Sequence, residues 1–258
     1  MIKIIVGMFF LLQIVVAGPA EDGRKIAEKA DKNIRGFGDE YTKNTMYLIN
    51  ANKDTVVRKM VSLTLEREFA EDHSIIQFLD PPDVKGTGLL TYQNPAGDDK
   101  QWLYLPDLRR VKKISSRKKS GSFMGSEFAY EDITGNTLNK FKYKKLEDAT
   151  YNGIDCYVVE KVPTYKNSGY TKIKVWFSKE NYLAQRMEYT DRKNSLLKVQ
   201  TFLGWKLYGK SSWRADGIVI ENLQTKKKSV LNFADRKLGT GKYKASDFTT
   251  RALERIIH

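Results

Sequence analysis

The sequence predicts a mainly β protein with a few helices, built around one large antiparallel sheet. Apolar and polar residues alternate with period two along segment after segment, and turn-forming residues separate those segments. Helical spacing is confined to the two ends of the chain. A chain of 258 residues is long enough for one sizeable hydrophobic core. Because no change in composition divides it, we expect a single domain over residues 18–258.

The amino terminus predicts a signal peptide over residues 1–17. Lys3 precedes an apolar run that starts at Ile4, and small residues follow at Ala17 and Ala20. The run is short for the about 20 residues that a membrane-spanning helix needs. We therefore expect cleavage after Ala17, with a cut after Ala20 as the alternative and an uncleaved anchor as the less favoured interpretation. The mature protein would be soluble and periplasmic, and the single Cys156 cannot form a disulfide within the chain.

Two segments show the spacing of helices. Ile26, Ala30 and Ile34 recur among charged residues within Asp22 to Ile34, which predicts an amphipathic helix. Near the other end, Ser246 to His258 begins with residues that cap helices and carries apolar residues toward its end. This pattern predicts a short closing helix.

The chain between these segments alternates like β-strands. A long strand begins near Tyr41, and Val57, Val61, Leu63, Leu65 and Phe69 share its dry face. The same alternation recurs at His73 to Leu79, Lys100 to Leu105, Lys140 to Lys144, Ile154 to Val162, Tyr170 to Ser178, Ala184 to Tyr189, Leu196 to Leu203, Gly217 to Thr225 and Ser229 to Lys237. We therefore expect about ten strands, joined as hairpins, with one buried face and one hydrated face.

The segment from Trp102 to Asp132 joins an aromatic strand, a basic strand and an aromatic loop. Gly121 and Gly125 give that loop backbone freedom, so we expect it to act as a flexible lid. Its cluster of positive charges consists of Arg109, Arg110, Lys112, Lys113, Arg117, Lys118 and Lys119. Together with a formal net charge of +14, the cluster indicates an anionic partner. For an exported protein we expect a membrane surface, lipid head groups or an acidic protein, and not nucleic acid; a hydrated basic surface is the alternative.

The sequence offers little for catalysis. It has two histidines, His73 and His258, and His73 is expected at the surface of a strand. Motifs typical of serine hydrolases, zinc proteases, dithiol redox proteins and phosphate-binding loops are missing from it. Glu131 and Asp132 form a carboxylate pair, for which helix capping or hydration is the favoured role and glycoside hydrolysis the less favoured one. We therefore expect no enzyme activity, no metal and no cofactor.

Aromatic residues make up 12% of the chain and predict an apolar hollow. A strongly curved sheet that does not close leaves a concave apolar face, which side chains or a ligand must fill. A lipid suits this place, because each buried methylene contributes about 0.8 kcal/mol and a long acyl chain does not enter water unaided. Ordinary core packing is the alternative for any single aromatic residue.

Two motifs in order carry a family resemblance. The segment LDPPDVKGTGLLTY from Leu79 to Tyr92, followed by WLYLPDLRR from Trp102, resembles the outer-membrane lipoprotein-sorting family of LolA-like periplasmic carriers. The resemblance implies an incomplete antiparallel β-barrel, capped by helices like LolA and LolB, with a cavity for acyl chains. It implies a strand–turn–strand segment with Phe78, Pro81, Gly86 and Leu90, a hairpin with Trp102, Tyr104, Pro106, Arg109 and Arg110, and a covering loop with Phe123, Gly125 and Asp132, none of them catalytic.

These patterns and the resemblance together predict a carrier. It would take an acylated lipoprotein or lipid from an inner-membrane exporter of the RND, MMPL or ABC type toward the outer membrane. The basic cluster would dock on the exporter or transiently on an anionic membrane. An exporter subunit without a lipid cavity is the alternative, and a secreted carboxylate-dependent glycosidase is less favoured. The candidate cavity residues are Phe78, Leu90, Trp102, Tyr104, Phe123, Met124, Phe128 and Trp176.

Overall fold

The computed structural model describes residues 18–258 except 68–70, 96, 136, 210–211 and 256–258. The predicted signal peptide, residues 1–17, lies outside the described residues, as do Phe69 and His258. The alternative cut after Ala20 falls in the first turn of helix α1 (Pro19–Ile34). Within the described ranges, no helix has the length and apolar character needed to cross a bilayer.

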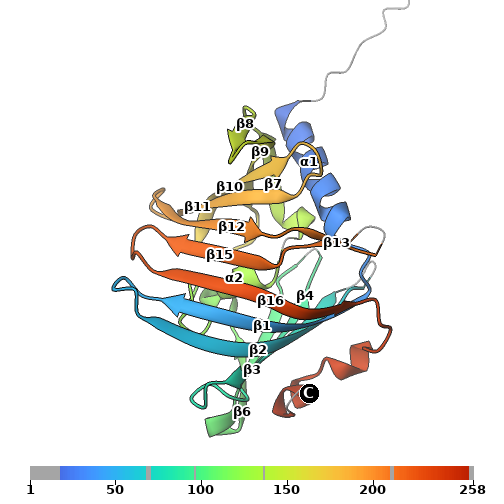
Figure 1. The fold of residues 1–258 in the computed structure, drawn as a ribbon, viewed down its shortest axis with the longest axis vertical. Helices are drawn as coiled ribbons and strands as arrows, with labels where there is room; N and C mark the ends of the chain where they lie inside the picture. The colour runs from blue at the N-terminus through green and yellow to red at the C-terminus, as the bar shows by residue number, and fades with distance from the viewer. Residues whose placement is uncertain (1–17, 68–70, 96, 136, 210–211, 256–258) are drawn as a thin grey trace, which may run out of the picture.

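Most of the described chain forms one antiparallel sheet that bends without closing (Figure 1). The strands of its first half are β1 (Asp39–Ile49), β2 (Thr55–Leu65), β3 (Asp72–Asp80), β4 (Gly88–Gln93), β5 (Lys100–Leu105) and β6 (Arg110–Ile114). Those of its second half are β7 (Phe141–Lys145), β8 (Ala149–Tyr151), β9 (Ile154–Pro163), β10 (Tyr170–Ser178), β11 (Ala184–Asp191), β12 (Leu196–Leu203), β15 (Gly217–Asn222) and β16 (Lys228–Leu238). The hydrogen-bonded order is β6-β5-β4-β3-β2-β1-β16-β15-β12-β11-β10-β9-β7, and β8 pairs with β9. Because β6 and β7 end this order, the barrel is incomplete, as predicted.

The strands agree with the sequence prediction in type but exceed it in number. Over the described residues there are sixteen strands and not about ten, because short strands such as β8 and the separate hairpin of β13 (Lys206–Tyr208) and β14 (Ser212–Arg214) carry too few residues to show alternation. The long strand near Tyr41 is two strands, β1 and β2. Asn50 and Asp54 hydrogen-bond to each other and turn the chain between them. Val57, expected on the dry face, is 41% exposed near this turn.

Helix α1 lies against the second half of the sheet (Figure 1). Pro19 starts the helix, and Glu21 and Asp22 in its first turn suit the positive end of the helix dipole. Gly23 allows close approach to β7, since a Cβ there would lie 2.7 Å from the backbone nitrogen of Lys145. Ile26 is buried with apolar residues of β9, β10 and β11. The predicted amphipathic helix is therefore confirmed, with its apolar stripe on the inner face of the sheet.

A covering segment, residues 115–140 with residue 136 aside, packs on the inner face of the first half of the sheet. It contains the short helices η2 (Ser116–Lys118), α2 (Tyr130–Ile133) and η3 (Leu138–Lys140); η1 (Pro106–Leu108) precedes it between β5 and β6. Phe123 and Phe128 are buried in a core with Met46, Met60 and Phe78. The sheet and this segment thus share one apolar core.

The carboxy-terminal segment, residues 239–255, packs on the outer face of the same strands. As far as it is described, the expected closing helix takes the form of two short 3-10 helices, η4 (Ala245–Asp247) and η5 (Thr250–Glu254), and not of one α-helix. Gln77 of β3 donates to the carbonyls of Leu253 and Arg255 at 3.4 and 2.9 Å, and so takes acceptors that a longer helix would use. Because Phe248 and Leu253 are fully buried, strands β2 to β4 have apolar packing on both faces.

Candidate functional site

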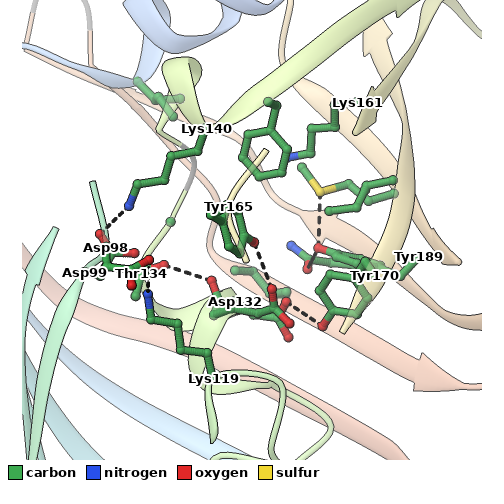
Figure 2. A pocket seen from close by; sticks show the side chains of 18 of the residues that line it. Asp98, Asp99, Lys119, Asp132, Thr134, Lys140, Lys161, Tyr165, Tyr170 and Tyr189 are labelled. Atoms are coloured by element: carbon green, nitrogen blue, oxygen red, sulfur yellow. Dashed lines mark hydrogen bonds and ion pairs between the residues drawn. The ribbon is translucent and has the colours of Figure 1, made fainter. Parts of the chain in front are cut away.

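A cavity of about 240 Å³ lies between the covering segment and the inner face of the second half of the sheet (Figure 2). Its apolar wall comes from α1 and the strands, at Ile34, Phe141, Ile173, Met187, Phe202 and Ile218. Its polar wall comes mostly from the covering segment and the β4–β5 loop, at Asp98, Asp99, Lys119, Glu131, Asp132 and Lys140. The cavity is therefore amphipathic: the wall formed by α1 and the strands is apolar, and the opposite wall is charged.

A second pocket of about 100 Å³ continues the hollow beneath α1. It shares Ile34, Lys161, Met187 and Phe202 with the first cavity. Its other walls are largely apolar and include Ala27, Ala30, Phe177, Leu183 and Trp205. Because the two pockets adjoin at these four shared side chains, we call them together the hollow.

Strand register places the characteristic residues of the hollow in one row. Lys161 of β9 lies opposite Ile173 of β10, Ile173 opposite Tyr189 of β11, and Tyr189 opposite Lys198 of β12. Residues directly opposite each other on neighbouring strands point to the same face. Two lysines and a tyrosine therefore stand among apolar residues on the inner face.

Three ion pairs fasten the covering segment around this row. Lys119 pairs with Asp98 at 3.2 Å, and Lys140 pairs with Asp99. Lys198 pairs with Asp132 at 2.6 Å, and both side chains are nearly inaccessible to solvent. Figure 2 shows Asp98, Asp99, Lys119 and Lys140 gathered on one side of the pocket, with Asp132 beside Tyr165 and Tyr170. Removing one partner of a buried ion pair is strongly destabilising, so the Lys198–Asp132 pair holds the segment to β12.

Glu131 and Asp132 are bound within the protein. Glu131 accepts hydrogen bonds from the Tyr165 hydroxyl at 2.8 Å, the Ser168 hydroxyl at 2.8 Å and the Gly169 amide at 2.7 Å. Burial nevertheless raises the pKa of Glu131 above its usual value. Asp132 accepts from the Tyr170 hydroxyl at 2.9 Å and from the Ala129 amide at 2.6 Å, which caps α2 as predicted for this carboxylate. Neither carboxylate faces the other across an open cleft of the kind that glycoside hydrolysis needs.

Lys161 is the most unusual ionisable group of the hollow. Its side chain is 5% exposed, and its Nζ lies 4.5 Å from the centre of the Phe141 ring. Burial lowers the pKa of Lys161 from its usual 10.5 to about 7, although the negative charge of Asp132 opposes the shift. A buried amine with a pKa near neutrality is a candidate for binding or for proton-linked events.

Known proteins share this fold over nearly the whole chain. An outer-membrane lipoprotein-sorting protein domain from Vibrio parahaemolyticus is 43% identical, with a TM-score of 0.88 over 92% of this chain and 100% of that one. The chain belongs to the outer-membrane lipoprotein-sorting protein family. This membership confirms the predicted resemblance, and supports a sorting or carrier role in general terms.

Other comparisons agree with the family and the fold. A DUF1329 family protein from Desulfovibrio piger is 26% identical, with a TM-score of 0.86 over 92% of this chain and 100% of that one. A LolA superfamily protein from Nitrosomonas europaea is 20% identical, with a TM-score of 0.73 over 89% and 98% of the two chains, which shows a LolA-like fold. A family model described as an uncharacterized protein matches residues 70–255. No curated protein matches the chain.

The structure separates the eight predicted cavity residues of this lipoprotein-sorting protein into two groups. Phe78, Phe123, Met124 and Phe128 come together on the inner side, in the core that joins the sheet to the covering segment. Leu90, Trp102 and Tyr104 pack instead with the carboxy-terminal segment on the outer face. Trp176 lies beside Lys174 and Arg186, on the face opposite to Val175. None of the eight lines the hollow described above. The four inner residues fill the core of the first half of the sheet, and period two places the other four on the outer face.

The predicted basic cluster has six exposed members and one buried member. Arg109, Arg110, Lys112, Lys113, Arg117 and Lys118 lie on or beside the edge strand β6, and we call them the basic edge. Lys119 points inward and pairs with Asp98, so its place in a surface cluster is wrong. No ion pair between residues of the described ranges includes a member of the basic edge.

Sequence reasoning missed the hollow's own residues. These residues were not singled out from the sequence, although five of the six lie in strands with recognised alternation. They are Lys161, Tyr165, Tyr170, Met187, Tyr189 and Phe202. Lys161 shares its face with Val159, and a lysine in the apolar phase of a strand is a signal that the sequence does contain. His73 was expected at the surface but is 6% exposed, stacked on Tyr92 with ring centres 4.0 Å apart. Within the described ranges there is no cluster of residues that could hold a metal ion.

Proposed function

We propose that this member of the lipoprotein-sorting family is an exported periplasmic carrier, folded as one domain over residues 18–258 after removal of residues 1–17. It holds an acyl chain of a lipoprotein or lipid in the hollow between α1, the sheet and the covering segment. It receives this cargo from an inner-membrane exporter and delivers it toward the outer membrane. Catalysis has no part in this function.

The observation that carries the proposal is the hollow of two adjoining pockets on the inner face of an unclosed sheet. Met187 and Phe202 line both of its parts, and Ile173 and Phe177 extend the apolar wall. Burying an acyl chain there contributes about 0.8 kcal/mol for each methylene removed from water. An exporter subunit with a solid interior would not have such a space.

The hollow is small for the pocket of a lipid. Its two parts, about 240 and 100 Å³, reach only the lower end of the about 300–1,000 Å³ that ligand pockets usually occupy. A cargo with several chains therefore requires the covering segment to move, and Gly125, whose φ is +77°, offers a backbone joint within it.

The basic edge supplies a docking surface for the proposed transfer. Its six exposed cations lie along β6 and on either side of it in the sequence, at one end of the sheet. Anionic lipid head groups attract such clusters by about 1 kcal/mol for each lysine or arginine near the membrane surface. In this proposal the basic edge meets the membrane or an acidic face of the exporter.

Native mass spectrometry of protein purified from its own periplasm tests the carrier function. We expect a retained acylated molecule in the wild type. Met187→Trp, which fills the junction of the two pockets, should reduce the retained fraction by at least about fivefold, since overpacking of about 1–3 kcal/mol must be relieved before a ligand enters.

Leu196→Trp is the matched control, because Leu196 is 40% exposed at the start of β12 and is not part of the hollow. It should retain ligand like the wild type. A wild-type protein without any bound lipid, even after incubation with periplasmic membranes, would contradict the carrier function. Equal retention by Met187→Trp would place the cargo elsewhere.

A further inference from the structure

Lys161 stands where the two parts of the hollow meet. It lines both pockets, with the apolar space beneath α1 on one side and the charged covering segment on the other. Figure 2 shows its side chain within the pocket, on the side opposite to Lys119 and Lys140. The sheet fixes its place, because β9 is paired on both sides, with β10 and β7. A charge in such a position faces any ligand whose chain lies beneath α1.

We propose that the hollow takes a single-chain amphiphile with an anionic head, a carboxylate or a phosphate monoester, with the head at Lys161 and the chain beneath α1. This inference rests on the proposed carrier function and names the class of its cargo. It favours a free fatty acid or a similar single-chain anionic lipid over a triacylated lipoprotein.

The pocket beneath α1 limits the number of chains. Ala27 and Ala30 leave room below the helix because their side chains are small, while Phe177 and Phe202 form the opposite side. At about 100 Å³ this space is smaller than the about 150 Å³ cavity that holds one benzene. It therefore has room for no more than one chain, and α1 or the covering segment must shift to admit a chain of full length.

The carboxylates around the hollow are already engaged and do not oppose an anionic head. Asp132 is held by Lys198 and Tyr170, Asp99 by Lys140, and Asp98 by Lys119. Asp31 pairs with Arg35 at 3.0 Å. Glu131 accepts three hydrogen bonds, and its raised pKa favours the neutral acid more than usual.

The charge of the ligand matters because Lys161 is buried. A neutral head beside it would remove water from its ammonium and form no ion pair with it. An anionic head instead forms an ion pair and charge-assisted hydrogen bonds with it, which are stronger in a site of low dielectric. The hollow should therefore distinguish ligands of equal chain length by their heads.

Isothermal titration of delipidated protein with dodecanoate, dodecyl phosphate and dodecanol tests this directly. At about neutral pH we expect the wild type to bind one or both anions at least about tenfold more tightly than the alcohol. In Lys161→Met the anions should lose about tenfold to a hundredfold in affinity. Dodecanol should change by less than about threefold, since methionine keeps the apolar volume. The anion that binds more tightly tells which head the site prefers.

Lys142→Met is the control, because Lys142 is exposed on the neighbouring strand β7 and the change in net charge is the same. It should leave all three affinities unchanged. Absence of binding by these three ligands and also by a triacylated lipopeptide would contradict the carrier function itself. Equal binding of acid, phosphate and alcohol by the wild type would overturn only the anionic head, and this comparison needs no variant. Tighter binding of a triacylated lipopeptide than of dodecanoate would overturn the single chain.

Discussion

Burial of Lys161 lowers the stability of the folded protein by an amount that depends on pH. Its pKa is about 7 in the folded protein and near the usual 10.5 in the unfolded chain. Between these values the unfolded chain holds the proton and the folded protein does not, so stability rises with pH through that window. Below about pH 7 both states are protonated and the full cost of burying the charge is present.

Lys161→Met should therefore raise the melting temperature, and more at about pH 6 than at about pH 9. Other ionisable groups also line the hollow, but they are common to both proteins; among them are Asp31, Glu131, Asp132, Lys119, Lys140, Tyr143, Tyr165, Tyr170 and Tyr189. Differential scanning calorimetry of the variant and the wild type at both pH values isolates the contribution of Lys161. A gain that is the same at both, or that matches Lys142→Met, would show that burial does not shift this lysine.

The sequence could predict which residues of a strand share a face of the sheet, but it could not predict which residues they contact. Period two already puts Trp102 and Tyr104 on the face opposite to Leu103, and the structure bears this out, with Leu103 in the inner core and the two aromatic residues outside. Which face is inner depends on what covers each side, and the carboxy-terminal segment that covers the outer face is distant in sequence. The ion pair of Asp132 and Lys198 joins residues that are 66 positions apart, so no local sequence pattern indicates it.

Among the elements, the covering segment depends on polar anchors as well as on its aromatic core. Phe123 and Phe128 supply the apolar contact, while Lys198 of β12 donates to the Glu127 carbonyl at 2.8 Å and pairs with Asp132 at 2.6 Å. An anchor of this kind fixes one position of the segment against β12. The covering segment is thus held by a buried charge pair as well as by apolar packing.

Lys198→Met should lower the free energy of unfolding by about 3–5 kcal/mol, because Asp132 would remain buried without its cation. Lys206→Met is the matched control, since Lys206 also pairs with an aspartate, Asp216, at 2.6 Å, but with 64% of its side chain exposed. That variant should lose less than about 1 kcal/mol. Urea denaturation measures both. Similar losses in the two variants would mean that the buried pair does not fasten the covering segment.

Strands were easier to predict than the segments that cover them. The bounds of β5, β10 and β12 agree with those expected from alternation, because one face of each is buried and the other is partly hydrated. The carboxy-terminal segment shows helical spacing, yet it follows the outer face as two 3-10 turns, since side chains of β3 and β4 bind its carbonyls. Such tertiary hydrogen bonds override local propensity and leave no trace in the sequence.

At the scale of the whole molecule, the unclosed sheet has two ends that differ in protection. Helix α1 lies against β7 at one end. At the other end, β6 pairs with β5 alone among the described strands. Four residues in or beside it are exposed cations: Arg109, Arg110, Lys112 and Lys113. Charge on an edge strand discourages pairing with another sheet. The same charge concentrates part of the protein's net +14 at one place, where it can meet an anionic surface.

Neutralising Arg109, Arg110, Lys112 and Lys113 to glutamine should therefore weaken binding to anionic phospholipid vesicles by at least about tenfold at about 0.05 M salt. The difference should shrink at about 0.5 M salt, where screening acts within a few ångströms. Vesicle cosedimentation at both salt concentrations measures it. The control variant loses four exposed lysines from turns elsewhere, Lys166, Lys193, Lys226 and Lys227. Both variants have the same net charge, so equal losses would assign the attraction to the whole molecule and not to the basic edge, whereas a loss confined to the first variant would make β6 the end of the sheet that approaches the membrane.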